Sequence, residues 1–190
     1  LIFFGGLILY SKSASFGLIF ADDNQIVAFA YSEEFKTERM IDRFSKSTGN
    51  AFYRPLLDIS FLIDGSVIEN RIEPLSFHRT NIILHLAAVL TAFFAFLRLG
   101  FNRNLSLFSA LFYLAHPLLT PAVSWISGRN DSLLALFILL SFIFYTFYSD
   151  KKGTLRCIYI ALHQLFFLAT LLARETAVFF TSTVLLSVLN

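Results

Sequence analysis

Two adjacent carboxylates, Asp22 and Asp23, follow directly after the apolar residues 16–21. We interpret this apolar stretch as the place where the chain leaves a membrane. An ionised carboxylate near hydrocarbon loses favourable hydration, so acids in this place are costly unless they have a role. An ionised aspartate can accept a proton in a transition state. The pair therefore indicates a site that acts on something the membrane delivers.

Further polar residues stand at the edges of apolar segments on the same predicted side of the membrane. Each has a structural explanation, because arginine can snorkel to the interface and His or Asn can hydrogen-bond a neighbouring helix. Together they predict a polar, partly dehydrated cavity. They are Arg54, His78, Arg79, Asn81, His85, His116, residues 125–131, Arg174 and Glu175. Arginine suits phosphate through its fork of donors, and the candidates are Arg174, Arg129 and Arg54, in that order.

The sequence gives little support for a metal ion. Asp22, Asp23, His78 and His116 could converge on a divalent cation, but no His-x-x-x-His motif with an acid accompanies them. His78 and His85 are seven residues apart, about two helical turns, which is too far to bind one ion. We expect no metal and no other cofactor. The single cysteine, Cys157, lies in an apolar run, and we expect a buried structural thiol.

The composition is that of a membrane protein. Hydrophobic residues make up 56% of the 190 residues and charged residues only 15%, below the quarter typical of soluble domains. Apolar runs of about 20 residues, the length that crosses a hydrocarbon core, recur along the chain. The net charge of +2 is too small and too dispersed to indicate nucleic-acid binding.

These runs predict an all-α, polytopic bundle of transmembrane helices. The spans are expected at about 1–19, 74–99, 105–119, 132–148, 155–173 and 176–190. The long segment at about 22–73 would hold two amphipathic helices in the membrane interface, at about 35–44 and from Pro55 to Gly65. Basic residues in two short turns, Arg98 with Arg103 and Lys151 with Lys152 and Arg156, place those turns in the cytoplasm. The long segment and the other polar residues are then external.

The chain starts without Met and stops at Asn190, in both cases inside an apolar run. We interpret it as the N-terminal part of a longer transmembrane domain, cut at both ends, and expect the fragment to be inactive by itself. Neither a broken helix nor repeated halves, which are common in transporters, are expected within the spans.

An ordered set of short motifs covers nearly the whole chain. It resembles the GT-C class of membrane glycosyltransferases, especially the TMTC-type and protein O-mannosyltransferase branch. The motifs are residues 20–23 (FADD), 53–56 (YRPL), 74–81 (PLSFHRTN) with Leu84-His85, 116–117 (HP), 122–131 (AVSWISGRND) and 173–177 (ARETA).

The chain departs from this branch at two places. Pro121 stands where the family more often has an acid, and Arg174 stands where it often has a lysine, which keeps the positive charge. The tetratricopeptide repeats of the TMTC branch are not within these residues.

The resemblance implies a GT-C-type helix bundle that transfers a sugar from a polyprenyl- or dolichyl-phosphate donor to an acceptor hydroxyl, with inversion. It implies a hexose, such as mannose, and a protein or glycan acceptor outside the cytoplasm. Asp22 is the expected general base and Asp23 the supporting acid, although the two could be reversed. Arg174, Arg129, Arg54, His116, His78 and Glu175 would bind the donor and its phosphate. We expect a bacterial inner membrane with a periplasmic site, or the endoplasmic reticulum if the chain is eukaryotic.

Two other function classes fit some of the same residues. A transporter or flippase of a lipid-linked phosphate would use the arginines for the headgroup. A non-catalytic membrane scaffold would leave Asp22 and Asp23 as solvated loop acids. Replacing Asp22 by Asn distinguishes them, because only a transferase has sugar transfer to lose.

Overall fold

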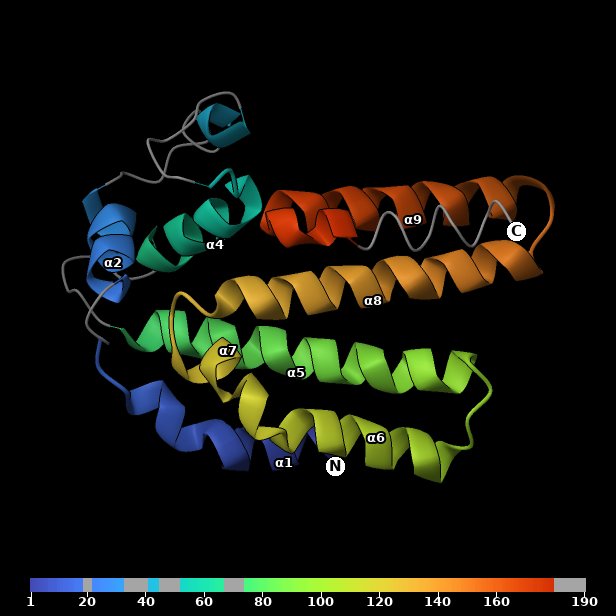
Figure 1. Ribbon diagram of the computed structural model, residues 1–190, viewed down its shortest axis with the longest axis horizontal. Helices are drawn as coiled ribbons and strands as arrows, with labels where there is room; N and C mark the ends of the chain where they lie inside the picture. Colours follow the sequence, from blue (N-terminus) through green and yellow to red (C-terminus); the bar gives the residue numbers. More distant parts are fainter. Residues whose placement is uncertain (19–21, 33–40, 45–51, 67–73, 180–190) are drawn as a thin grey trace.

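The computed structural model describes residues 1–18, 22–32, 41–44, 52–66 and 74–179, and within these ranges every regular element is a helix. In chain order the elements are α1 (Ile2–Tyr10), η1 (Ser11–Ser15), α2 (Asp23–Ser32), α4 (Pro55–Ser66), α5 (Leu75–Arg98), α6 (Arg103–Ala115), η2 (Pro117–Leu119), α7 (Thr120–Ser124), α8 (Arg129–Asp150), α9 (Gly153–Ala173) and η3 (Glu175–Ala177) (Figure 1). Residues 41–44 form one further helical turn.

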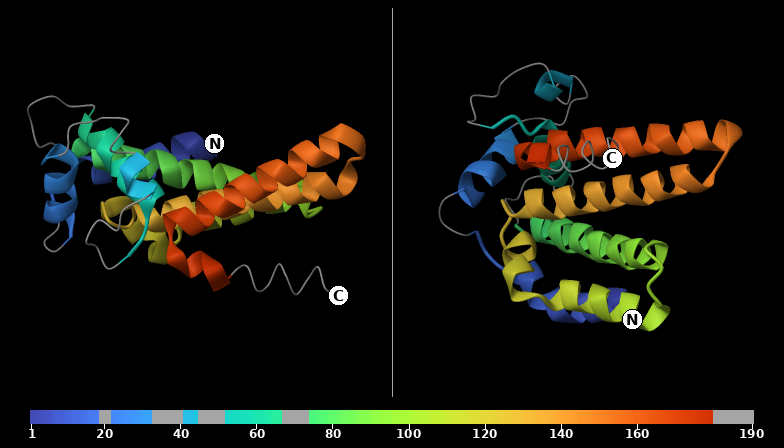
Figure 2. Two further views of the ribbon diagram at one scale, coloured as in Figure 1. Left: turned by 90° about the horizontal axis from the view of Figure 1, so that it is seen from above. Right: turned by 45° about the vertical axis from the view of Figure 1, so that its right-hand side comes forward.

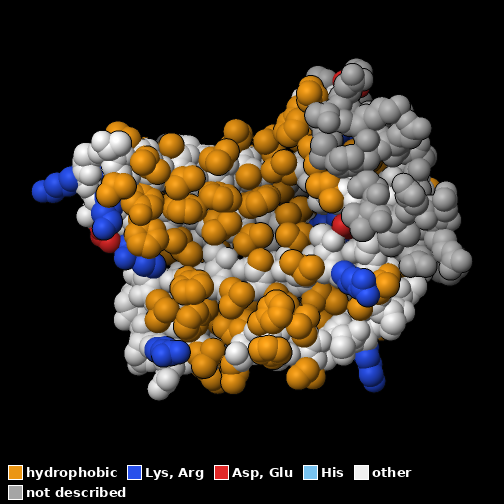
Figure 3. Space-filling model, turned by 180° about the vertical axis from the view of Figure 1, so that it is seen from behind, with side chains coloured by type: hydrophobic (Ala, Val, Ile, Leu, Met, Phe, Trp, Pro, Cys, Tyr) orange, Lys and Arg blue, Asp and Glu red, His pale blue; other side chains and the backbone are white. Residues whose placement is uncertain are grey.

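Three helices, α5, α8 and α9, are long and apolar enough to cross a membrane. A bent pair, α6 followed by η2 and α7, is a fourth candidate. Apolar side chains cover the middle of a broad face of the molecule, while most Lys and Arg side chains lie toward its two ends (Figure 3). The predicted all-α membrane helix bundle is therefore confirmed, and the protein is an integral, multi-pass membrane protein.

The long helices lie side by side in the order α6, α5, α8, α9, and neighbours in this row pack against each other (Figure 1). Because successive helices alternate in direction, the turns at 99–102 and 151–152 share one end of the bundle, called here the turn end. At the opposite end, called the loop end, α2 lies beyond the start of α5, and α4 packs between α2 and α9 (Figure 2). The polar residues singled out in the sequence, apart from His85 and His116, are carried by elements that meet at the loop end.

The third apolar segment is broken, which corrects the expectation of unbroken spans. The helical pair bends by 54° at the break after α6. Pro117 explains the break, since proline has no N–H and disfavours helical geometry in the residue before it. His116 is accordingly extended, with ψ 124°, and its Nδ1 accepts a hydrogen bond from the backbone N–H of Leu118 at 3.3 Å. The helix α7 lies between the spans expected at about 105–119 and 132–148, where no helix was predicted.

The other differences concern local structure. The sequence analysis did not predict α2, whereas α4 coincides with the second interfacial helix expected from Pro55 to Gly65. Only 41–44 of the first interfacial helix and 176–179 of the sixth span lie within the described residues. Cys157 is exposed, so the expectation of a buried thiol was wrong. It lies on the outer face of α9 beside exposed Leu155 and Ile158, where lipid, rather than protein, can cover apolar side chains.

Candidate functional site

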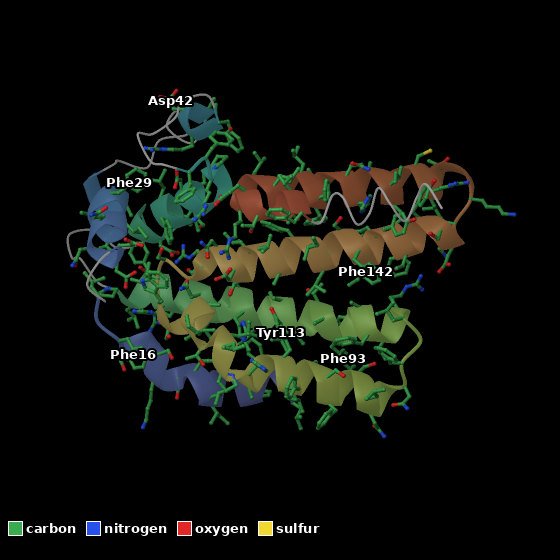
Figure 4. The ribbon with its side chains drawn as sticks, viewed as in Figure 1. Phe16, Phe29, Asp42, Phe93, Tyr113 and Phe142 are labelled. Atoms are coloured by element: carbon green, nitrogen blue, oxygen red, sulfur yellow. The ribbon has the colours of Figure 1, made fainter. Side chains whose placement is uncertain are left out.

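A cavity of about 480 Å³ lies at the loop end between α2, α4 and the loop after α7. We call it the α2–α4 cavity. It is lined by Asp22, Gln25, Ile26, Phe29, Phe52, Arg54, Leu57, Asp58, Phe61 and Ser127. Phe29 extends from α2, and the guanidinium carbon of Arg43 lies 4.5 Å from the centre of its ring (Figure 4). The cavity thus combines acids and an arginine with apolar walls, as a site for an amphipathic ligand requires.

The two walls approach closely because of a glycine. A Cβ atom added at Gly65 of α4 would lie 2.5 Å from the carbonyl oxygen of Ala30 in α2, too close for any side chain. Val27 and Ala30 of α2 are buried in one cluster with Leu57 and Phe61 of α4. The packing of α2 on α4 therefore fixes the width of the cavity.

The structure gives the two adjacent aspartates different surroundings. Asp22 is exposed and lines the α2–α4 cavity, while Asp23 is fully buried. Asp23 begins α2, where a carboxylate is favoured by the helix dipole, and accepts a hydrogen bond from the backbone N–H of Ser127 at 3.3 Å. Of the two predicted bases, Asp22 is the one that a ligand in the cavity can contact.

A bidentate ion pair joins Arg54 and Glu175, two predicted site residues that lie far apart in the sequence. Nε of Arg54 donates to Oε2 of Glu175 at 2.7 Å and Nη2 donates to Oε1 at 2.5 Å. These hydrogen bonds lower the pKa of the Glu175 carboxyl to about 2. The same fork of donors fits a phosphate, so Glu175 holds the position that a phosphate on Arg54 would take.

Arg174 lies next to this pair but is held by a different acid. Its Nη1 forms an ion pair with Oδ1 of Asp131 in the first turn of α8. The buried Nε of Arg174 has no hydrogen-bond partner among the described residues. Arg174 is not among the described residues that line the α2–α4 cavity.

Arg129 is fully buried beneath the cavity, in the centre of a polar cluster that links three helices. It forms an ion pair with Asp64 of α4, and its Nη1 donates to Oγ of Ser60 at 3.1 Å. Nε donates to Oδ1 of Asn81 at 2.7 Å and Nη2 donates to the carbonyl of Phe77 at 3.0 Å, both in α5. These bonds occupy four of the five guanidinium N–H groups. The phosphate role of Arg129 stays a prediction, whereas its contacts join α4, α5 and α8.

This polar cluster also fixes the loop after α7. The side-chain amide of Asn81 donates to the carbonyls of Trp125 at 2.9 Å and Ile126 at 3.4 Å. A Cβ atom at Gly128 would lie 2.2 Å from the carbonyl oxygen of Pro121, so the loop can close only with glycine there. In this closed loop, the backbone N–H of Ser127 donates to Asp23, and Ser127 also lines the α2–α4 cavity.

The histidines are not brought to one place. His78 is fully buried, with its ring edge-on to Phe16. His116 lies in a separate groove, against Phe112 and near Tyr113, which Figure 4 places between α5 and α6. Among the described residues no three His, Cys, Asp or Glu side chains lie close enough to hold a metal ion.

The sequence analysis missed one acid of the cavity, Asp58. It is half-buried on α4, and burial raises the pKa of its carboxyl to about 6 against the opposing effects of Arg43 and Arg54. The available signal was its position four residues after Arg54, which is one helical turn when the helix begins at Pro55. The sequence analysis treated this segment only as an apolar interfacial helix.

Comparison with known proteins identifies relatives for about half of the chain. It is 35% identical over 112 residues to the protein O-mannosyl-transferase TMTC1 of Mus musculus, which is 58% of this chain and 12% of that protein. It is 34% identical over 116 residues to the human protein O-mannosyl-transferase TMTC4, which is 54% of this chain and 16% of that protein. The resemblance to the TMTC-type branch is confirmed.

The human protein O-mannosyl-transferase TMTC2 is 35% identical over 102 residues, again about half of this chain. The matched part of each of these three relatives is 12–16% of its length. No protein-family model and no solved structure matches the chain.

Proposed function

We propose that the full-length protein is a membrane glycosyltransferase that moves a hexose, such as mannose, from a polyprenyl- or dolichyl-phosphate donor to a hydroxyl group of a protein or glycan acceptor. The observation that supports this most is the α2–α4 cavity, where Asp22 and Arg54 line one space in a chain similar to protein O-mannosyl-transferases. An acid beside a phosphate-binding arginine is what such a transfer requires.

The reaction that fits this pair is an inverting displacement. The acceptor oxygen attacks the anomeric carbon while Asp22 accepts the proton of the acceptor hydroxyl. The bond between the anomeric carbon and the phosphate oxygen breaks, and the lipid phosphate leaves with the electron pair. Arg54 releases Glu175, binds the phosphate in its place and stabilises the negative charge on the phosphate. Arg174 adds positive charge nearby. Asp23, held by Ser127, fixes the start of α2 and thereby the position of Asp22.

We further propose that the loop end is external. Arg98, Arg103, Lys151, Lys152 and Arg156 lie at the turn end, and basic residues of short loops stay in the cytoplasm. The cavity then faces the periplasm in a bacterium or the lumen of the endoplasmic reticulum in a eukaryote. Lipid phosphates in the outer leaflet would reach the cavity from the membrane surface.

The test uses full-length protein, a polyprenyl-phosphate hexose and a serine- and threonine-containing peptide. Asp22→Asn should lower the rate of sugar transfer by about 10²- to 10⁴-fold, the usual contribution of a general base, while donor binding is kept. Asp150→Asn at the turn end is the matched control and should transfer at the normal rate. Normal transfer by both Asp22→Asn and Asp23→Asn would refute the mechanism.

A transporter of a lipid-linked phosphate is the second candidate, and the break between α6 and α7 favours it. Discontinuous helices often line transporter binding sites. The distinguishing measurement reconstitutes the full-length protein in vesicles with a lipid-linked hexose. Movement of the lipid between leaflets without any glycosylated product would support the transporter and contradict the transferase.

A further inference from the structure

We propose that Asp58 is a sugar-contacting residue of the α2–α4 cavity, where its carboxylate accepts hydrogen bonds from hydroxyl groups of the hexose whose phosphate lies on Arg54. This inference rests on the proposed function, and it names the residue that distinguishes a hexosyl phosphate from a bare phosphate.

The position of Asp58 on α4 supports the assignment. Asp58 and Phe61 line the cavity from this helix, and Arg54, the residue just before it, lines the same cavity. Ser60 and Asp64 contact Arg129 instead, in the buried cluster. The two faces of α4 therefore have different roles, and Asp58 belongs to the face that a ligand can reach.

The spacing of Arg54 and Asp58 fits a hexosyl phosphate. Arg54 directly precedes α4, and its carbonyl accepts a hydrogen bond from the backbone N–H of Asp58 at 3.1 Å. The two residues are therefore one helical turn apart, a separation of about 5–6 Å between Cβ atoms. A hexose ring with its hydroxyl groups spans a similar length. A phosphate on the guanidinium of Arg54 would then place sugar hydroxyls near the carboxylate of Asp58.

No contact among the described residues gives the Asp58 carboxylate a structural role. Its carboxylate makes no hydrogen bond or ion pair with the described part of the chain, although it is half-buried. A carboxylate offers about four acceptor positions, and leaving them unfilled in a partly dehydrated place is costly. Hydroxyl groups of a sugar are donors that can fill them.

The surrounding charges keep Asp58 ionised at neutral pH despite its burial. The groups that surround it are Asp22 just before α2, Gln25 in α2, Arg43 in residues 41–44, Arg54 with its partner Glu175, and Ser127. Burial raises the pKa of the Asp58 carboxyl to about 6, and the two arginines oppose that rise. Asp58 should therefore accept charge-strengthened hydrogen bonds above about pH 6, and it loses that charge as it is protonated below this pH.

The experiment measures binding of two probes, mannose 1-phosphate and inorganic phosphate, to full-length protein. Asp58→Asn should weaken mannose 1-phosphate binding by about 10- to 100-fold, the usual range for charged hydrogen bonds. It should leave inorganic phosphate binding at least as tight, because one negative charge near Arg54 is removed. Retained phosphate binding also shows that the cavity is folded. Wild-type affinity for mannose 1-phosphate should fall more steeply below about pH 6 than that of Asp58→Asn, because the phosphate of the probe titrates in the same range in both proteins. Asp150→Asn is the matched control.

Three results would overturn the inference: unchanged binding of both probes by Asp58→Asn, equal weakening of both, or a wild-type pH profile that the variant shares. The proposed function is judged separately by the transfer assay. Wild-type protein that transfers sugar while Asp58→Asn binds mannose 1-phosphate normally refutes only the role of Asp58. Wild-type protein without any transfer refutes the proposed function, whatever Asp58 binds.

Discussion

Two arginine–carboxylate pairs lie on either side of α4 and differ in what surrounds them. In the buried pair the side chains of Arg129 and Asp64 are 0% and 6% exposed. In the pair beside the cavity those of Arg54 and Glu175 are 18% and 43% exposed. Arg129 has partners in α4 and α5 besides its acid, whereas the fork of Arg54 is bound by Glu175 and otherwise lies over the ring of Phe52.

The difference indicates which arginine can exchange its partner. A buried pair cannot lose one member without leaving an uncompensated charge in a dehydrated place. A pair that water reaches gains little net energy and can be replaced by another anion. The same residue types therefore hold the helices together on one side of α4 and remain available to a phosphate on the other.

Breaking the buried pair should have the largest effect. Arg129→Met leaves Asp64 unpaired and should lower the free energy of unfolding by about 3–5 kcal/mol. Thermal unfolding of the purified protein in detergent measures this loss. The double variant Arg129→Met/Asp64→Leu should recover most of the stability, because neither charge then remains buried. Arg98→Met, which breaks the more exposed Arg98–Asp150 pair, is the control. Equal losses for Arg129→Met and Arg98→Met would contradict the distinction.

Separating α2 from α4, the two helices that form the cavity walls, should cause the next largest loss of stability. Gly65→Ala forces the backbones of α2 and α4 apart and should cost about 1–3 kcal/mol, as overpacked sites do. Gly5→Ala in α1 is the matched control, since its added Cβ meets no atom within 4 Å. Unfolding midpoints of the two variants test this. A stabilised Gly65→Ala protein would show that the close approach is not needed.

Removing the half-buried carboxylate of Asp58 should stabilise the protein. Burial raises the pKa of Asp58 from 3.8 to about 6 in the folded state, so the folded protein binds the proton more tightly than the unfolded chain does. Stability is then lost as pH rises from about 4 to 6. Asp58→Asn should gain about 1–2 kcal/mol relative to wild type at pH 8, and the gain should vanish near pH 3. Unfolding at both pH values checks it, and destabilisation at pH 8 would contradict a ligand-facing Asp58.

Breaking the exposed pair should have the smallest effect on stability. Glu175→Gln should cost less than about 1 kcal/mol, because water and salt screen the pair. The pKa of Glu175 is lowered from 4.5 to about 2, so its stabilising effect is present above about pH 4.5 and is lost as pH falls toward 2. Unfolding of wild type and Glu175→Gln at pH 6 and pH 2 tests this sign. Glu175→Gln should also bind inorganic phosphate more tightly, because Arg54 no longer has a competing anion.

The membrane fold could be predicted because composition and run length determine it. Segments as apolar as α5, α8 and α9 cannot be dissolved in water, and their backbone groups can be satisfied in lipid only by helices. Because successive spans alternate in direction, most of the polar motifs were predicted to lie on one side of the membrane. The break at His116 and Pro117 was missed, although the chemistry of proline was visible in the sequence. The exposure of Cys157 could not be predicted, because an apolar residue in a membrane can face either protein or lipid.

The sequence by itself determined the class of the protein and the residue types of its site. The ordered motifs from Asp22 to Glu175 predicted the TMTC-type resemblance that the relatives confirm. Only the tertiary structure decided which polar residues share a space. In the structure Asp22 is exposed whereas Asp23 is buried, and Arg129 is buried whereas Arg54 lines the cavity. The structure also shows that Asp58 lines the cavity. The reason is that hydration and pairing depend on neighbours far apart in the chain, and one-dimensional spacing does not specify which face of a helix those neighbours cover.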